Sequence, residues 1–194
     1  MEEYPKPWSS ILTRGLTLYQ FKKYFINSIG EKEALKSFAT LPEGARDTVL
    51  DVKKSSWYPF ETQRLLRELI ISKTDPGNPL EAIFNMGLET ASWDFSGFLK
   101  PLFSFIPLET ILNKTAALWN KYYNTGEITV HSFTKGLARI DLHSFPSDQH
   151  FCPVITSWMT MALRTLKKKA PCVNHDICIH KGDSFCRFDL TYTP

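Results

Sequence analysis

Three cysteines and one histidine in the last third of the chain have types and spacing that could bind a metal ion. His175 and Cys178 are three residues apart, Cys186 follows eight residues later, and Cys152 precedes His175 by 23 residues. Thiolate and imidazole are preferred ligands of zinc, and a closed set of four protein ligands is typical of a structural rather than a catalytic site. We therefore predict one structural zinc site made by Cys152, His175, Cys178 and Cys186.

Other roles for these residues are open at this point. A single buried cysteine is usually a small apolar residue, and Cys178 and Cys186 could form a disulfide in an oxidising compartment. Cys172 could replace His175 as the fourth ligand, although its place at the far end of the predicted strand favours a packing role. Strict alternation along that strand puts His175 and Cys178 on opposite faces, so the site would need a bulge or a twist there.

The elements that position these residues follow from hydrophobic periodicity. Helical spacing predicts helices over 17–29, 31–39, 43–52, from about 58 to 74, 80–99, 108–122 and 153–169. Alternation with period two predicts two hairpins, made by 128–133 with 137–143 and by 172–177 with 185–192. The predicted fold class is α+β. The helical N-terminal two-thirds pack on an antiparallel sheet, and a C-terminal hairpin–helix–hairpin carries the zinc site.

Length and charge limit the class of protein. A chain of 194 residues fits a flexible tail, residues 1–10, followed by a single domain, residues 11–194. The net charge of +3 is too small to indicate nucleic-acid binding, which requires a clustered basic face, and the one run, Lys167-Lys168-Lys169, lies where a helix is expected to end. No signal-peptide core and no run of 18 apolar residues is found, so we expect a cytoplasmic protein without a membrane span. Cysteines in a reducing cytoplasm serve as metal ligands or buried thiols rather than in disulfides.

Catalytic motifs are missing from the sequence. It contains no phosphate-binding glycine loop, no nucleophile elbow and no paired-histidine protease motif. The remaining titratable candidates are Glu81, Glu89 and Asp94 on one predicted helix, and His131, His143 and His150 further along the chain. Isolated helix carboxylates are usually solvated, and none of these histidines has a partner that the sequence reveals. We predict that the chain is not an enzyme.

The C-terminal residues also carry a resemblance. The vinyl-4-reductase domain has a C-terminal signature that this chain resembles over Cys152 and the run His175-Asp-Ile-Cys178-Ile-His-Lys-Gly182-Asp183-Ser-Phe-Cys186-Arg-Phe188. That domain is the sensory module of phenol- and xylene-responsive bacterial transcription activators, and it is related to the Bet-three-type subunits of the vesicle-tethering TRAPP complex. In the sensory modules a Cys, a Glu and two more Cys bind zinc, and His175 stands here in place of the Glu.

A second resemblance covers about residues 11–192. Ser56-Trp57-Tyr58-Pro59 and Leu118-Trp119-Asn-Lys-Tyr122-Tyr123-Asn-Thr-Gly126 resemble a family with many paralogues in gliding and predatory bacteria. That family is similar to the same superfamily and has His at the same ligand position. The resemblance also implies an alternative cofactor, haem, because nitric-oxide-sensing domains are distant structural relatives of the superfamily. None of the five histidines stands out as an axial ligand, so zinc is preferred.

These resemblances imply a cavity between the helices and the sheet that holds an aromatic effector or an acyl chain. Candidate lining residues are Trp93, Phe95, Phe98, Trp119, Tyr122 and Trp158. The alternative is that these rings fill the space themselves. We predict a non-catalytic sensor or binding domain with an apolar or aromatic small-molecule ligand, acting as a homodimer built on residues 11–55. The alternative function is a TRAPP-type scaffold subunit that recruits a protein partner and binds no small molecule.

Overall fold

The computed structural model describes residues 10–97, 99–100, 103 and 106–193. Its first half is a helical lobe. The helices of this lobe are α1 (Gly15–Ile29), α2 (Glu31–Phe38), α3 (Glu43–Leu50), α4 (Phe60–Thr74) and α5 (Pro79–Ser96). Two short strands that periodicity did not reveal, β1 (Leu12–Arg14) and β2 (Trp57–Pro59), pair antiparallel and tie the starts of α1 and α4 together. The predicted tail lies, except for Ser10, outside the described residues.

The second half contains the main sheet. Its elements are α7 (Leu108–Leu112), α8 (Thr115–Trp119), β3 (Glu127–Thr134), β4 (Leu137–His143), α9 (Phe151–Thr165), β5 (Lys169–Asn174) and β6 (Cys186–Thr193). The four strands pair antiparallel in the order β3-β4-β6-β5. The predicted α+β class with an antiparallel sheet is therefore confirmed.

Local sequence sets several of the element boundaries. Helix α1 ends at Gly30, whose φ of 83° is a conformation that glycine adopts without steric cost. Pro79 begins α5, where its missing N–H would have no partner within the helix. Just before α9, the Asp148 carboxylate accepts a hydrogen bond of 2.9 Å from the backbone N–H of His150. None of the described helices is long and apolar enough to cross a membrane.

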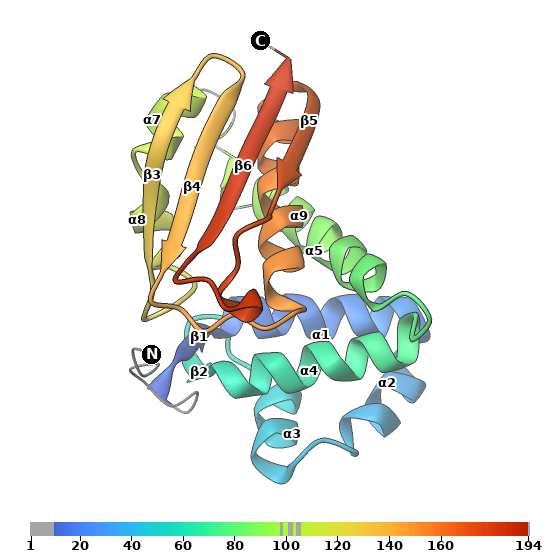
Figure 1. The fold of residues 1–194 in the computed structure, drawn as a ribbon. Coiled ribbons are helices and arrows are strands. Elements are labelled where there is room, and N and C mark those ends of the chain that lie inside the picture. The colour runs from blue at the N-terminus through green and yellow to red at the C-terminus, as the bar shows by residue number, and fades with distance from the viewer. Residues whose placement is uncertain (1–9, 98, 101–102, 104–105, 194) are drawn as a thin grey trace.

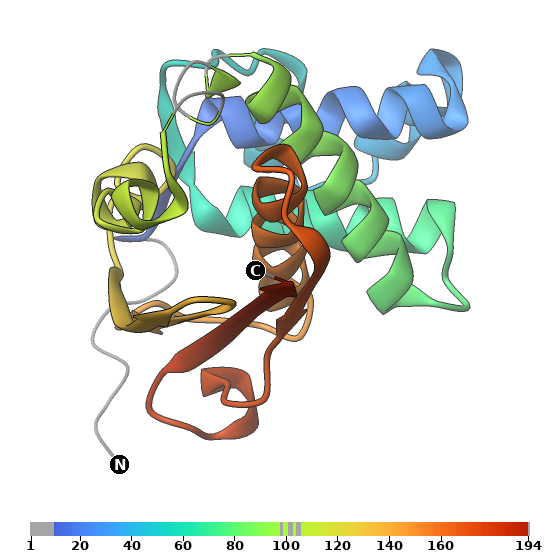
Figure 2. The same ribbon diagram turned by 90° about the horizontal axis from the view of Figure 1, so that it is seen from above.

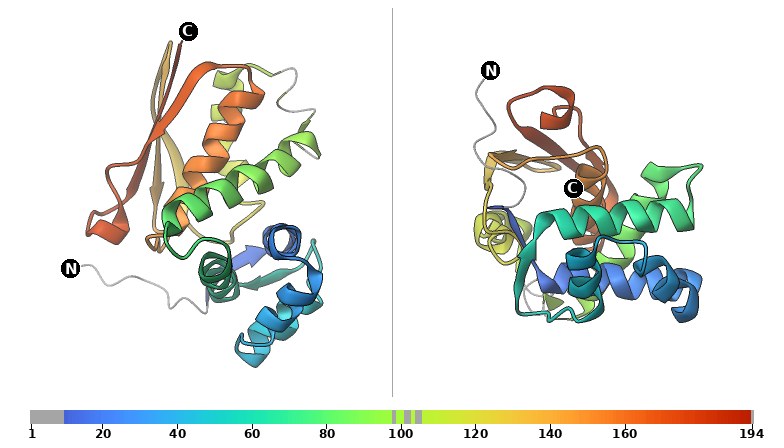
Figure 3. Two further views of the ribbon diagram at one scale, coloured as in Figure 1. Left: turned by 90° about the vertical axis from the view of Figure 1, so that its right-hand side faces the viewer. Right: turned by 90° about the horizontal axis from the view of Figure 1, so that it is seen from below.

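The elements form layers around α9 (Figure 1). Seen from the side and from above, the sheet covers one side of α9 and α5 lies on its other side, while α1 and α4 cross below (Figures 2 and 3). Helices α5 and α9 meet closely at Gly87, where an added Cβ would lie 1.8 Å from the Ser157 hydroxyl oxygen. A side chain at position 87 would therefore push the two helices apart.

Five aromatic rings join the helical lobe to the sheet half. They belong to Phe60, Trp119, Tyr123, Phe145 and Phe151, and the centroid distances among the pairs in contact run from 4.5 to 6.4 Å. All five are buried and belong to one hydrophobic cluster. The space between helices and sheet is thus largely filled by the chain's own rings, which favours the filled alternative for this part of the molecule.

Candidate functional site

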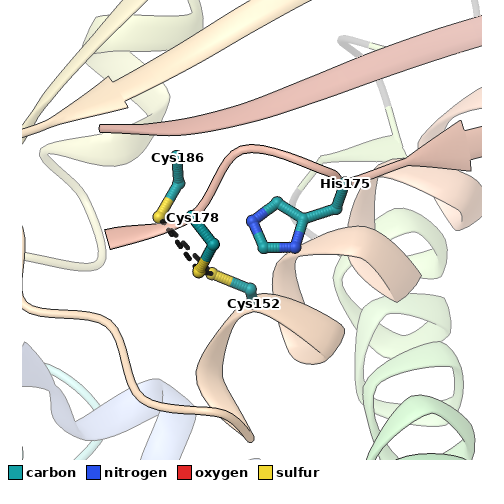
Figure 4. A group of neighbouring side chains, drawn as sticks. All are labelled: Cys152, His175, Cys178 and Cys186. Atoms are coloured by element: carbon teal, nitrogen blue, oxygen red, sulfur yellow. Dashed lines mark hydrogen bonds between the residues drawn. The ribbon is translucent and has the colours of Figure 1, made fainter. Parts of the chain in front are cut away.

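The four predicted ligand residues come together at the end of the sheet that faces the helical lobe (Figure 4). The Cys152 sulfur lies 3.8 Å from that of Cys178 and 3.7 Å from that of Cys186, and the latter two sulfurs are 3.7 Å apart. With a ring nitrogen of His175, all four ligand atoms lie within 4.8 Å of one another. Metal–sulfur bonds of about 2.3 Å in a tetrahedral site place the sulfur atoms roughly 3.8 Å apart. The sulfur spacing therefore matches that of a closed metal site.

Separate elements supply these side chains. Cys152 lies in the first turn of α9, Cys186 begins β6, and His175 directly follows β5. Cys178 precedes a short 3-10 helix at Ile179–Lys181. The predicted bulge is wrong, because β5 ends at Asn174 and strand alternation no longer constrains the residues beyond it.

Cys172 is not part of the cluster. It is exposed within β5, and its sulfur lies 3.5 Å from the side-chain oxygen of Asn174. The structure therefore places His175, and not Cys172, in the fourth position.

Hydrogen bonds hold the loop that carries the cluster. The Asp183 carboxylate accepts the backbone N–H of Cys178 at 2.8 Å, and the Ile179 N–H donates to the Cys186 sulfur at 3.4 Å. Hydrogen bonds to the two neighbouring sulfurs, together with burial, raise the pKa of the Cys152 thiol, whereas hydrogen bonding with Cys152 lowers the pKa of Cys178 and of Cys186.

The His175 ring completes the site. It stacks on Phe188 with centroids 4.7 Å apart. Its Nε2 is buried and has no hydrogen-bond partner among the described residues. Buried polar atoms are normally hydrogen-bonded, so an unpartnered ring nitrogen beside three thiols is available to bind a metal ion.

The segment 147–151 joins the cluster to the helical lobe. The Ser147 hydroxyl oxygen lies 3.3 Å from the Cys186 sulfur, and the His150 ring Nδ1 lies 2.7 Å from a carboxylate oxygen of Glu68 on α4. Asp148 forms an ion pair with Arg67, which is also on α4. The Arg67 side chain is fully buried. Burial lowers the pKa of this guanidinium group, and its Nε and Nη1 have no partner among the described residues. Sequence patterns did not single out Arg67.

A cavity of about 90 Å³ lies between α1, α5, α8, β3 and α9. Of the predicted pocket residues, Trp119, Tyr122 and Trp158 line it. Trp93 instead lies under the Lys23 ammonium group, 4.2 Å from the ring centroid. Phe95 packs in the core against Phe103 and Trp158, and Phe98 lies outside the described residues.

Asp94 forms the polar part of this cavity. Its Oδ1 accepts a hydrogen bond of 2.5 Å from the Gln20 amide, and its Oδ2 accepts bonds of 2.8 Å from the Tyr122 hydroxyl and 3.2 Å from the Trp158 indole. The residue is 3% exposed, and burial raises the pKa of its carboxyl group. The expectation of a solvated carboxylate is wrong for Asp94. A signal existed, since Asp94 continues the helical stripe of buried positions 83, 86, 87, 90 and 91.

Comparisons with known proteins identify the fold. No family model matches the chain, and no curated protein matches it. Solved structures of H-NOX proteins do. The Fe(II) unliganded H-NOX protein from K. algicida has 10% identity and a TM-score of 0.72, with 93% of this chain and 97% of that chain covered. The Fe(II)NO H-NOX protein from S. oneidensis has 10% identity and a TM-score of 0.73, covering 93% and 99%. An H-NOX structure from work on heme distortion has 11% identity and a TM-score of 0.68, covering 93% and 95%.

These matches correct the resemblance drawn from the sequence. The assignment to the vinyl-4-reductase and TRAPP-type superfamily is wrong, because the matching solved structures are H-NOX domains. The residues that carried the first resemblance are Cys152 at the start of α9 and the segment 175–188, which together are a small part of the chain. The prediction of zinc as the cofactor is also wrong, because the H-NOX family binds haem. That this chain is not an enzyme stays a prediction, because these matches concern the fold. The homodimer built on residues 11–55 stays a prediction.

Proposed function

We propose that this chain is a ligand-sensing domain with the H-NOX fold that works without haem. The observation that carries the proposal is the cavity at Asp94, which is lined by residues of both halves of the fold. Its walls include α1 and α5 of the helical lobe and α9 of the sheet half. A ligand in this position contacts both halves, so its binding energy is available to change how they pack.

Haem does not fit the residues present. All five histidines are among the described residues, and neither they nor the cysteines line the cavity. Its volume of about 90 Å³ is small beside the roughly 300–1,000 Å³ of sites that hold larger organic ligands. The ring cluster described above occupies the adjoining space.

Two of the three other side chains at the cavity that could ligate haem iron are already hydrogen-bonded. Tyrosine and methionine serve as axial ligands in some haem proteins, and Tyr122, Tyr123 and Met159 line the cavity. The Tyr122 hydroxyl donates to Asp94, and the Tyr123 hydroxyl accepts a hydrogen bond of 3.2 Å from the Gln63 amide. Burial raises the pKa of both phenols, that of Tyr123 to about 12, which opposes the phenolate that binds iron. Among the described residues that line the cavity, Met159 is then the one remaining candidate ligand for haem iron.

A structural role is proposed for the cluster of Cys152, His175, Cys178 and Cys186. The cluster binds one metal ion that prefers thiolate ligands, and the ion links the start of α9 to the start of β6. The sulfur spacing of 3.7–3.8 Å and the unpartnered Nε2 of His175 support this role. Elemental analysis of the purified protein identifies the ion, and the ion should be lost from Cys186→Ser and retained by Cys172→Ser.

The haem-free proposal is tested by titrating the purified protein with haemin and recording the absorption spectrum. We expect no saturable Soret shift and no haem retained after gel filtration. Native mass spectrometry of protein from an unsupplemented culture should show a small organic molecule on part of the population. One haem retained per chain would refute the proposal and return the domain to haem-based sensing.

A further inference from the structure

Among the described residues, no cationic side chain lies beside the Asp94 carboxylate in the cavity. The three groups that donate to its carboxylate are the Gln20 amide, the Tyr122 hydroxyl and the Trp158 indole, all of which are neutral. No lysine, arginine or histidine side chain is among the described residues that line the cavity. A carboxylate has about four acceptor positions, so one is left after these three bonds. Buried carboxylates without a cation are unfavourable, and a cationic ligand would remove that cost.

A buried hydroxyl group in the cavity has no hydrogen-bond partner among the described residues. The Thr17 hydroxyl oxygen on α1 is buried and has no hydrogen-bond partner among the described residues, and the whole residue is 6% exposed. Thr17 lines the same cavity as Asp94 and lies one helical turn before Gln20. A ligand with two N–H groups could therefore satisfy both the carboxylate and this hydroxyl.

The remaining walls suit an apolar body next to a positive charge. They are formed mainly by aromatic and aliphatic side chains, among them Phe21, Trp119, Tyr122 and Trp158. The faces of tryptophan and tyrosine rings attract cations. An anion would be repelled by Asp94, and a strongly polar molecule would lose its hydration against these walls without replacement.

The cavity volume sets the size of the ligand. A dry protein cavity of about 150 Å³ accommodates benzene, which has six non-hydrogen atoms. In proportion, a cavity of about 90 Å³ holds about three to four non-hydrogen atoms. This is the size of ethylamine or n-propylamine.

We propose that the Asp94 cavity binds a short primary alkylammonium ion, with its charged head between Asp94 and Thr17 and its alkyl chain against the tryptophan rings. The proposal deepens the sensor function above and rests on it, because it names the class of molecule that the domain detects.

The test is a calorimetric titration of the full chain with three probes of equal length: n-propylammonium, n-propanol and propionate, at one pH and one ionic strength. Four non-hydrogen atoms support a dissociation constant of tens of micromolar at best, on the order of 40 μM, so the titrations must extend to millimolar concentrations. We expect one site per chain for n-propylammonium, at least tenfold weaker binding of n-propanol, and no binding of propionate.

Two variants locate the site. Asp94→Asn keeps the size of the side chain and removes its charge, so it should weaken n-propylammonium binding at least tenfold and leave n-propanol unaffected. Thr17→Val removes the unpartnered hydroxyl without adding volume; it should fold normally and weaken n-propylammonium binding less. Asp189→Asn is the control, since this carboxylate pairs with Arg139 on the sheet and does not line the cavity.

The outcomes separate the two proposals. Binding of n-propanol as tight as that of n-propylammonium, or n-propylammonium binding that survives both Asp94→Asn and Thr17→Val, would overturn the ammonium proposal and leave the sensor function standing. If none of the probes binds and no small molecule co-purifies, both proposals fall. The indole N–H resonance of Trp158 gives a second readout, because this group bonds directly to Asp94 and should shift on binding.

Discussion

Replacing Asp148 with asparagine is expected to destabilise the protein by about 3 kcal/mol. The substitution removes the carboxylate that pairs with the fully buried Arg67. Two guanidinium nitrogens of Arg67 already lack partners among the described residues, so little else compensates the charge. Breaking a buried ion pair from one side costs about 3–5 kcal/mol, because the remaining charge stays in a medium of low dielectric constant. The Asp148 side chain is 19% exposed, which favours the lower end of that range.

Removing the other partner should cost less. Arg67→Met takes away the charge itself and leaves an apolar chain beside the rings of Phe60 and Phe151, whose centroids lie 5.5 and 5.6 Å from the guanidinium carbon. Asp148 is then free to be hydrated from its exposed side. Replacing buried ion pairs with apolar residues is often neutral or stabilising by about 1–4 kcal/mol. The double variant Arg67→Met/Asp148→Asn should therefore be more stable than Asp148→Asn alone.

Equilibrium unfolding in urea, followed by circular dichroism, measures these differences. The total stability of a domain is about 5–15 kcal/mol, so a loss of about 3 kcal/mol moves the midpoint clearly. Asp189→Asn is the matched control, because it breaks an ion pair with Arg139 that is partly exposed to solvent and should therefore cost less. The reasoning is refuted if Asp148→Asn is no more destabilising than Asp189→Asn, since Arg67 would then not depend on its carboxylate.

Three further substitutions probe the cluster, the helix crossing and the cavity. Cys186→Ser should lower the melting temperature and release bound metal, whereas Cys172→Ser, at an exposed position, should do neither. Identical melting curves for the two variants would exclude a structural role for the cluster. Gly87→Ala should lower the free energy of unfolding, measured in urea, by about 1–3 kcal/mol, because the added Cβ would lie 1.8 Å from the Ser157 hydroxyl oxygen. Adding Ser157→Ala to the same chain should restore part of that stability. Burial raises the pKa of Asp94, so the folded state binds its proton more tightly than the unfolded state does. Stability should therefore fall as the pH rises from the ordinary pKa of 3.8 through the raised pKa, by about 1.4 kcal/mol for each unit by which the pKa is raised. Melting temperatures at several pH values should show this slope in the native chain and not in Asp94→Asn; parallel profiles would contradict it.

Local patterns were sufficient for most of the elements and for the four residues of the cluster. Alternating residues around Gly136 predict the hairpin of β3 and β4, and helical spacing predicts α9. The cluster was predictable because thiol and imidazole side chains are chemically distinctive and its two tightest members are three residues apart. The bulge at His175 was wrong because alternation assumes that the strand continues, and the chain leaves β5 at Asn174.

What the sequence determined by itself is therefore the type of most elements and the side chains that form the cluster, since periodicity depends on neighbours along the chain and thiol and imidazole groups are distinctive in themselves. The tertiary structure alone decided which polar residues are buried and what they contact. Gln20 bonds to Asp94 across 74 residues of sequence, and Arg67 pairs with Asp148 across 81. Periodicity predicts which face of a helix is buried, but it does not predict which other element packs against that face. The cavity, the buried ion pair and the H-NOX fold all follow from how those faces meet.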